Sequence, residues 1–188
     1  QRVILLQQGN FTEDGIPKNI VNKYLKEEIE TYLFNRPEKD QLKSLNTFFE
    51  DIYFKGFNDE KLFVLQSGTR VTLCFSIKNL IYIDEIEIGV GIYDQNESPL
   101  IQCTSSMHEK YYLMRPETSL RVKMVIPKFP LSKGTYYINV FIKNKKNKIL
   151  DHIKKCLYFE VIDGDYYHRG INTLSPKPIL IEFELQES

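Results

Sequence analysis

The sequence lacks the charge imbalance and the long apolar runs that mark two large functional classes. Lys plus Arg and Asp plus Glu number 25 each among 188 residues, so the formal net charge is zero. A nucleic-acid-binding module usually shows a basic excess or a basic face, and a membrane helix needs roughly 18 consecutive apolar residues. Neither feature is present, and no signal-peptide pattern opens the sequence. We therefore expect neither a nucleic-acid partner nor a membrane span.

Tryptophan is absent, and cysteine and histidine number three each. Cys74, Cys103 and Cys156 lack CxxC spacing, and an odd, unpaired set favours a reducing cytoplasm over secretion. The histidines show no metal-ligand spacing with one another or with the cysteines. The sequence therefore predicts no metal site and no bound cofactor.

Catalytic motifs are missing as well. There is no glycine-rich phosphate loop, so the residues that would hold ATP phosphates are absent. Glu85 and Glu87 share one strand face, but the carboxylates of a glycosidase must flank a sugar across a cleft. The best candidate nucleophile, Ser67, lies in a turn and not in a strand-to-helix elbow. We therefore predict a binding protein and not an enzyme.

Apolar patterning divides the sequence into three regions. In residues 1–28, the run Val3-Ile4-Leu5-Leu6, the turn signal Asp14-Gly15 and a helix start at Ile16-Pro17 predict strand, strand and helix. Residues 29–47 are polar, contain the breaker Pro37 and are expected to form a linker. Residues 48–188 change to a period of two, which defines the third region.

The third region alternates apolar and polar residues in short segments. Apolar side chains fall on one strand face between Thr69 and Lys78, and again between Glu85 and Asp94. The same alternation recurs over residues 120–126, 136–142, 157–161 and 179–185. Short alternating strands separated by turns predict an all-β fold, an immunoglobulin-like antiparallel β-sandwich with the strand-strand-helix segment as an appendage. Gly134 followed by Tyr136 resembles the tyrosine corner of such sandwiches.

Residues 2–25 contain Asp14-Gly15-Ile16-Pro17 and Val21-Asn22-Lys23-Tyr24-Leu25. These motifs resemble those of the ATP-binding subunits of ABC exporters for O-antigen and related polysaccharides, the Wzt type. They are similar to the end of the nucleotide-binding domain, just after its switch histidine. The resemblance implies that residues 1–28 are a remnant of that domain.

Residues 48–188 are similar to the C-terminal domain of the same family. The landmarks, in chain order, are Leu65-Gln66-Ser67-Gly68, Gly89-Val90-Gly91-Ile92-Tyr93-Asp94, Ile126-Pro127, Leu131-Ser132-Lys133-Gly134-Thr135-Tyr136 and Phe159-Glu160-Val161-Ile162-Asp163-Gly164-Asp165-Tyr166. Each motif is short, and it is their shared order and spacing that carry the resemblance.

The resemblance implies a cytoplasmic, non-catalytic carbohydrate-binding domain, peripheral to the inner membrane. It would bind a finished surface polysaccharide of O-antigen type and couple it to the exporter. The membrane-spanning exporter subunit would be contacted through the ATPase domain, whose Walker A and signature motifs this sequence lacks. A homodimer formed by exchange of the last strand is also implied. The alternative is a structural or protein-docking sandwich that binds no glycan.

A candidate sugar site comes from the outward residues of three strands that lie side by side in an immunoglobulin-like sandwich. Sugar rings bind flat aromatic faces beside polar side chains. Gly89 and Gly91 would form the floor of a shallow trough, because glycine inside a strand often marks the close approach of a ligand or another backbone. The walls would be Tyr93, Tyr137, Asn139, Phe141 and Tyr158.

Other interpretations of this face stay open. A dimer or linker contact over it, or a bend in the sheet, also explains the two glycines. The polar run from Gln102 to Ser106 is interpreted as a solvated loop. The loop pairs Tyr111-Tyr112 and Tyr166-Tyr167 are the next candidates for sugar contacts, because exposed loop aromatics often bind ligands.

The end of the sequence is the candidate dimerisation segment. Residues 175–178 are expected to be extended and rigid, because prolines fix their own dihedral and restrict the preceding residue. The apolar residues that follow at alternate positions are Ile179, Ile181, Phe183 and Leu185. A strand of this kind suits exchange onto the sheet edge of a second copy, which it would also protect.

Overall fold

The structure is a computed structural model that describes residues 3–7, 10–15, 20, 45–56, 60–175 and 177–183. Near the start of the chain, β1 (Val3–Gln7) and β2 (Asn10–Gly15) pair antiparallel, as the sequence predicts. The predicted helix after them lies outside the described residues except for Ile20, which is helical and buried. Most of the predicted linker, residues 29–44, also lies outside them.

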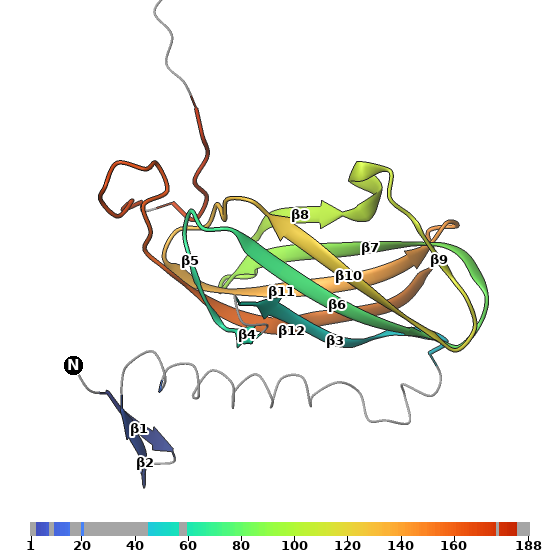
Figure 1. Ribbon diagram of the computed structural model, residues 1–188, viewed down its shortest axis with the longest axis horizontal. Helices are drawn as coiled ribbons and strands as arrows, with labels where there is room; N and C mark the ends of the chain where they lie inside the picture. The colour runs from blue at the N-terminus through green and yellow to red at the C-terminus, as the bar shows by residue number, and fades with distance from the viewer. Residues whose placement is uncertain are drawn as a thin grey trace, which may run out of the picture.

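Two facing sheets form the main body of the molecule (Figure 1). The first sheet has the order β10 (Thr118–Ile126), β6 (Val71–Asn79), β3 (Thr47–Lys55) and β4 (Lys61–Leu62). The second has the order β5 (Val64–Gln66), β12 (Ile149–Ile162), β11 (Gly134–Asn144), β7 (Ile83–Asp94) and β8 (Pro99–Thr104). A short strand, β9 (Tyr112–Met114), also pairs with β7, and the 3₁₀ helix η1 (Ser105–His108) follows β8. The predicted β-sandwich is confirmed.

The core between the sheets follows the predicted alternation. Along β7 the four apolar residues at alternate positions from Ile86 to Ile92 are all buried. Phe54 of β3 and Phe159 of β12 meet edge to face across the two sheets, with ring centroids 4.9 Å apart. Phe129 contacts both rings, at 6.5 and 6.0 Å. Such aromatic contacts add to the stabilisation from apolar burial.

The predicted tyrosine corner is also present. The hydroxyl of Tyr136 donates a hydrogen bond to the carbonyl of Ser132, four residues upstream, at 3.0 Å. Tyr136 is buried, and burial raises the pKa of its hydroxyl. The corner fixes how the chain enters β11, which is the central strand of the candidate site.

One strand pair departs from the antiparallel prediction. β5 runs parallel to β12, with Leu65 opposite Val161. The cause is a crossing between the sheets: β4 ends at Leu62 in the first sheet, and β5 begins at Val64 in the second. The carbonyl of Phe63, the residue between them, accepts a hydrogen bond from the N–H of Glu160 at 2.8 Å. The crossing strand therefore arrives beside β12 in the same direction.

Two family landmarks meet at this end of the sandwich. Gly68 has φ of 76°, and a Cβ there would lie 2.9 Å from the Cα of Tyr166. A Cβ on Gly164 would lie 2.0 Å from the carbonyl oxygen of Ser67. Glycine is required at both positions, because the two turns approach each other more closely than a side chain allows.

The predicted C-terminal strand does not form over the residues described. Ile179 makes a single antiparallel bridge with Leu131, and the N–H of Leu180 donates to the carbonyl of Pro130 at 2.7 Å. The buried side chain of this segment is Leu180, whereas Ile181 and Phe183 are each 68% exposed. Leu185 lies outside the described residues. Proline at 178 has no N–H to donate, which limits a ladder within this chain to a few bonds.

Candidate functional site

Three tyrosines stand side by side on the outward face of the second sheet. Tyr137 of β11 is the direct cross-strand partner of Tyr93 on β7 and of Tyr158 on β12. The rings of Tyr93 and Tyr137 are stacked, with centroids 5.4 Å apart and planes 7° apart. The Tyr158 ring lies 5.5 Å from that of Tyr137 at 37°. These three residues form what we call the tyrosine row, and the structure brings together what the sequence predicts for this face.

The middle ring of the tyrosine row is enclosed by its neighbours. Tyr137 is 4% exposed, whereas Tyr93 and Tyr158 are half-buried. The Nζ atom of Lys155 lies 5.4 Å from the centroid of the Tyr137 ring and pairs with the carboxylate of Glu97 at 2.6 Å. Burial and the nearby Glu97 charge raise the pKa of the Tyr137 hydroxyl, and Lys155 opposes them. Tyr137 therefore supports the two outer rings and offers little surface to a ligand.

Asn139 has a structural task beside the row. β12 contains an irregularity opposite Asn139, where Lys155 adopts φ of 50°. The side-chain oxygen of Asn139 accepts a hydrogen bond from the N–H of Lys155 at 2.7 Å. This bond satisfies a backbone donor that the interrupted ladder leaves without a partner strand. Asn139 thus positions Lys155 over Tyr137.

The two strand glycines do not leave an open trough. A Cβ on Gly89 would lie 2.0 Å from the Phe141 ring, and a Cβ on Gly91 would lie 2.8 Å from the Tyr93 ring. The glycines therefore make room for the protein's own aromatic rings, which lie across β7. The predicted empty floor is wrong in this respect, although its residues share one face. The rings of Phe141 and Tyr93 fill the space over the two glycines.

Polar side chains continue this face beyond Phe141. Thr104 and Ser106 share a hydrogen bond at 2.8 Å, and the hydroxyl of Ser106 donates to the carboxylate of Glu87 at 2.8 Å. Gln102 is exposed and lies opposite Gly91 on β8. The run from Gln102 to Ser106 is therefore strand and 3₁₀ helix and not the predicted loop. It adds hydrogen-bonding groups beside the rings.

Both loop tyrosine pairs lie next to hollows. Tyr111 lines a polar hollow of about 460 Å³ together with Glu85 and Glu87. Tyr167 lines another of about 590 Å³ with Lys128 and Phe183. Its partner Tyr166 is buried, with Lys128 Nζ 4.4 Å from its ring centroid. The first hollow extends the polar end of the outward face, and the second is part of the C-terminal segment.

The comparison with known families decides the relationship of this chain. The sequence model of the Wzt C-terminal domain matches residues 44–174. The chain belongs to the Wzt C-terminal domain family. No curated protein matches the chain at the level of whole sequences. Membership of the Wzt family supports a part in polysaccharide export by an ABC transporter.

A solved structure of the same family supports the fold. The crystal structure of the C-terminal domain of Wzt superposes with a TM-score of 0.62 at 12% sequence identity, covering 76% of this chain and 84% of that one. A Niemann-Pick type C2 protein from Japanese carpenter ant reaches a TM-score of 0.46 at 9% identity, covering 60% and 90%. The Wzt match confirms the β-sandwich, and the weaker one carries no further weight.

Two contributors to the site could not be read from the sequence. Glu97 and Lys155 both have positive φ, and each is placed by an irregular backbone at a turn or a bulge. Neither has a local pattern that points to the tyrosine row, because they come from segments 58 residues apart. Among the described residues, no group of three His, Cys, Asp or Glu could hold a metal ion, and no helix is long and apolar enough to cross a membrane.

Proposed function

We propose that the chain binds a bacterial surface polysaccharide of O-antigen type on the outward face of its second sheet, without catalysis. The observation that carries this proposal is the row of Tyr93, Tyr137 and Tyr158, packed ring against ring, with Phe141 over Gly89 further along the same face. Aromatic rings fixed in this way are suited to the C–H faces of pyranose rings. Membership of the Wzt family supports the same substrate class.

The packing of the face favours affinity for a sugar polymer. Rings that are already held by their neighbours lose little conformational freedom when a sugar covers them. Tyr93 and Tyr158 are half-buried and Gln102 is exposed, so these three side chains offer the contact surface. Hydroxyl and amide groups beside the rings provide hydrogen bonds that orient the sugar. The face would thus select by shape and by hydroxyl pattern.

Membership of the Wzt family supports a cellular role in polysaccharide export. The domain would capture the finished glycan in the cytoplasm, peripheral to the inner membrane, and present it to the exporter. Its partners would be an ATPase domain preceding the sandwich and, through it, the membrane-spanning subunit. Residues 1–28 would be the end of that ATPase domain, and residues 29–47 the linker to the sandwich in 48–188.

A calorimetric titration with the surface polysaccharide of the source organism tests the proposal. Tyr158→Ala and Phe141→Ala should each raise the Kd about tenfold or more, because truncating an aromatic contact in a binding hot spot costs roughly 1 to 3 kcal/mol. Gly91→Leu should weaken binding too, because any side chain there displaces the Tyr93 ring. Tyr53→Ala, on the outward face of the other sheet, is the matched control and should leave the Kd unchanged.

Each variant is first checked for folding by thermal unfolding. Tyr137→Ala is not a suitable probe of binding, since loss of a buried ring also lowers stability. If the Tyr158, Phe141 and Gly91 variants fold and bind polymer like the parent, the glycan lies elsewhere. The hollow beside Tyr111 is then the next position to test.

We also propose that the chain forms a homodimer through its C-terminal segment. Ile181 and Phe183 are largely exposed, and they follow directly on backbone bonds that hold residues 178–180. Two exposed apolar side chains at alternate positions suit addition to a sheet edge of a second copy. Ile179 contacts its own chain, so exchange would begin after Leu180 and would include Leu185.

Light scattering at micromolar concentration tests the dimer. We expect twice the chain mass of 22.2 kDa, and the double variant I181D/F183D should have the mass of a single chain. Both side chains are exposed, so the variant should keep its fold. A parent protein with the mass of one chain would contradict exchange. A sandwich that dimerises but binds no glycan in the titration would instead be a docking module.

A further inference from the structure

The sandwich is open along one side, between β10 and β8. Each of these strands is at the edge of its sheet, and they lie next to each other in Figure 1. A slot of about 530 Å³ separates them. Its interior is a different place from the tyrosine row, because it lies between the sheets and is lined there by core-facing side chains such as Phe75 and Ile88, while Thr104 at its border also belongs to the outward face.

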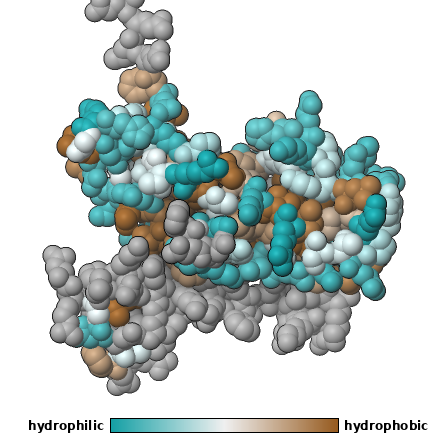
Figure 2. Space-filling view, in the orientation of Figure 1, coloured by the Kyte–Doolittle hydropathy of each residue, from teal (hydrophilic) through white to brown (hydrophobic). Residues whose placement is uncertain are grey.

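The interior of the slot is apolar and reaches the core. Phe75 of β6 and Ile88 of β7, each 2% exposed, line it from opposite sheets. Met124 of β10, Cys103 of β8 and Tyr112 of β9 line it as well, and all three are only half-buried. Figure 2 shows apolar surface bordered by hydrophilic side chains on this side of the molecule.

β10 shows that this side is incompletely covered. Its core-facing residues at alternate positions from Leu120 to Ile126 are all half-buried, whereas the equivalent residues of β6 from Leu73 to Ile77 are at most 2% exposed. The difference arises because β10 is at the edge and faces the slot. Covering this surface with hydrocarbon would remove apolar area from water, which is favourable.

Cationic side chains surround the open side of the slot. Lys110 and Lys123 line it and are exposed, and the exposed His108 belongs to the same lining. Glu109, the carboxylate next to them in the sequence, is not part of the lining. The slot therefore combines an apolar interior with a positively charged opening.

We propose that this slot binds the hydrocarbon chain of an amphiphile that has one long chain and an anionic head group. The chain would occupy the space between Phe75, Ile88 and Met124, and the head group would lie between Lys110 and Lys123. The charge of the opening favours an anionic head over a neutral one. This proposal does not depend on the glycan site, and each can fail without the other.

The full chain and sodium oleate provide the first test, with Cys103 as reporter. The cysteines are not disulfide-bonded, and Cys74 and Cys156 are buried, so their thiols serve as internal references. Burial raises the pKa of the Cys103 thiol, so alkylation with iodoacetamide is followed at alkaline pH by peptide mass spectrometry. At about ten times the Kd, oleate should slow alkylation of Cys103 about tenfold, because only unoccupied protein reacts.

Charge variants give the second test. Lys110→Glu and Lys123→Glu should each weaken oleate binding about fivefold, the size expected for one exposed charge pair. Neither should change the binding of oleyl alcohol, which has the same chain without the charge. Lys133→Glu, an exposed lysine outside the slot, is the matched control. These surface changes leave the core untouched, so the variants should fold.

Three results would overturn the proposal. The first is absence of saturable 1:1 oleate binding, and the second is saturable binding that leaves Cys103 as reactive as before. The third is protection of Cys103 from alkylation in the absence of oleate, if this protection increases with protein concentration as the measured mass of the protein doubles. That result would mean that a second copy of the chain fills the slot.

Discussion

The outward faces of the two sheets each carry a tyrosine beneath a lysine, yet the two tyrosines are held differently. Tyr137 on the second sheet is packed between two further rings and is 4% exposed. Tyr53 on the first sheet is half-buried, with the Nζ atom of Lys61 5.0 Å from its ring centroid. Burial and the neighbouring Cys74 raise the pKa of the Tyr53 hydroxyl. One face is thus built from rings and the other from separate side chains.

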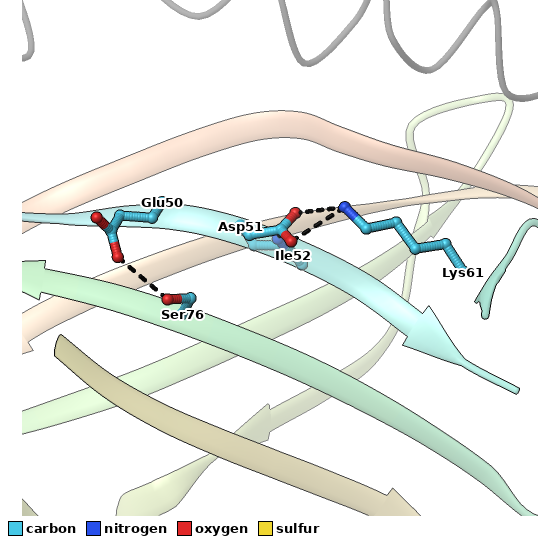
Figure 3. Close-up of polar contacts among 5 residues, drawn as sticks. All are labelled: Glu50, Asp51, Ile52, Lys61 and Ser76. Carbon is cyan, nitrogen blue, oxygen red and sulfur yellow. Dashed lines mark hydrogen bonds and ion pairs between the residues drawn. The ribbon is translucent and has the colours of Figure 1, made fainter. Parts of the chain in front are cut away.

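The first face carries polar contacts of β3 with its neighbours, which Figure 3 shows. A bulge in β3 inserts Glu50 into the strand, and its carboxylate accepts a hydrogen bond from Ser76 at 3.1 Å. Asp51 pairs with Lys61 at 2.9 Å, and both side chains are well exposed. Exposed pairs of this kind contribute about 0 to 1 kcal/mol. We therefore expect a ligand to lose less side-chain freedom on the ring-packed face of the second sheet than on the described face of the first.

The largest effect that follows from this comparison is on stability. Tyr137→Ala should lower the free energy of unfolding by about 3 kcal/mol, the range for deleting a buried aromatic ring. Tyr53→Ala should cost about 1 kcal/mol, the centre of the range for ordinary substitutions. Denaturant unfolding of both variants against the parent measures the two values. If both variants lost the same free energy of unfolding, the tyrosine row would add nothing beyond the burial of one ring. The two faces would then not differ in how they hold their tyrosines.

Much of this contrast is already present in the sequence, because strand alternation assigns each residue to a face. Alternation in Glu85–Asp94 places Tyr93, Gly91 and Gly89 outward, and the structure confirms that assignment. Gly134 followed by Tyr136 likewise predicts the tyrosine corner, which the structure contains. These features depend on residues that are close together in the sequence, so the pattern of one strand is enough to predict them.

The features that the sequence could not predict depend on irregular backbone, on side-chain rotamers and on contacts between the two sheets. The bulge beside Asn139 places Lys155 over Tyr137, and a turn brings Glu97 to meet it. The occupation of the glycine positions by Phe141 and Tyr93 depends on side-chain rotamers that period-two patterning does not contain. The crossing at Phe63 depends on both sheets, because the chain leaves the first sheet there and joins the second. Such features arise from tertiary contacts between distant segments.

The smallest effect expected from the comparison is the acid titration of the Glu97–Lys155 pair. The hydrogen bond and charge of Lys155 lower the pKa of Glu97, and Glu97 in turn raises the pKa of Lys155. A carboxylate with a lowered pKa stabilises the fold above its unfolded pKa of about 4.3, and that contribution disappears as pH falls through the folded value. A lysine with a raised pKa contributes below about pH 10.4 and loses the contribution at higher pH. The pair should therefore be intact between these limits and should break only in acid or in strong alkali.

Tyr137 reports on this titration, because Lys155 lies over its ring. The ring resonances of Tyr137 should shift in NMR spectra as pH falls below about 4.3 and Glu97 becomes protonated. Glu97→Gln should abolish that shift, while Asp51→Asn, which removes the ion pair of the other face, should leave it unchanged. Both carboxylates are on exposed surfaces, so neither variant should unfold the protein. A Tyr137 resonance that titrates identically in the Glu97→Gln variant would mean that Lys155 is held over the ring by Asn139 and the bulge alone, without help from the ion pair.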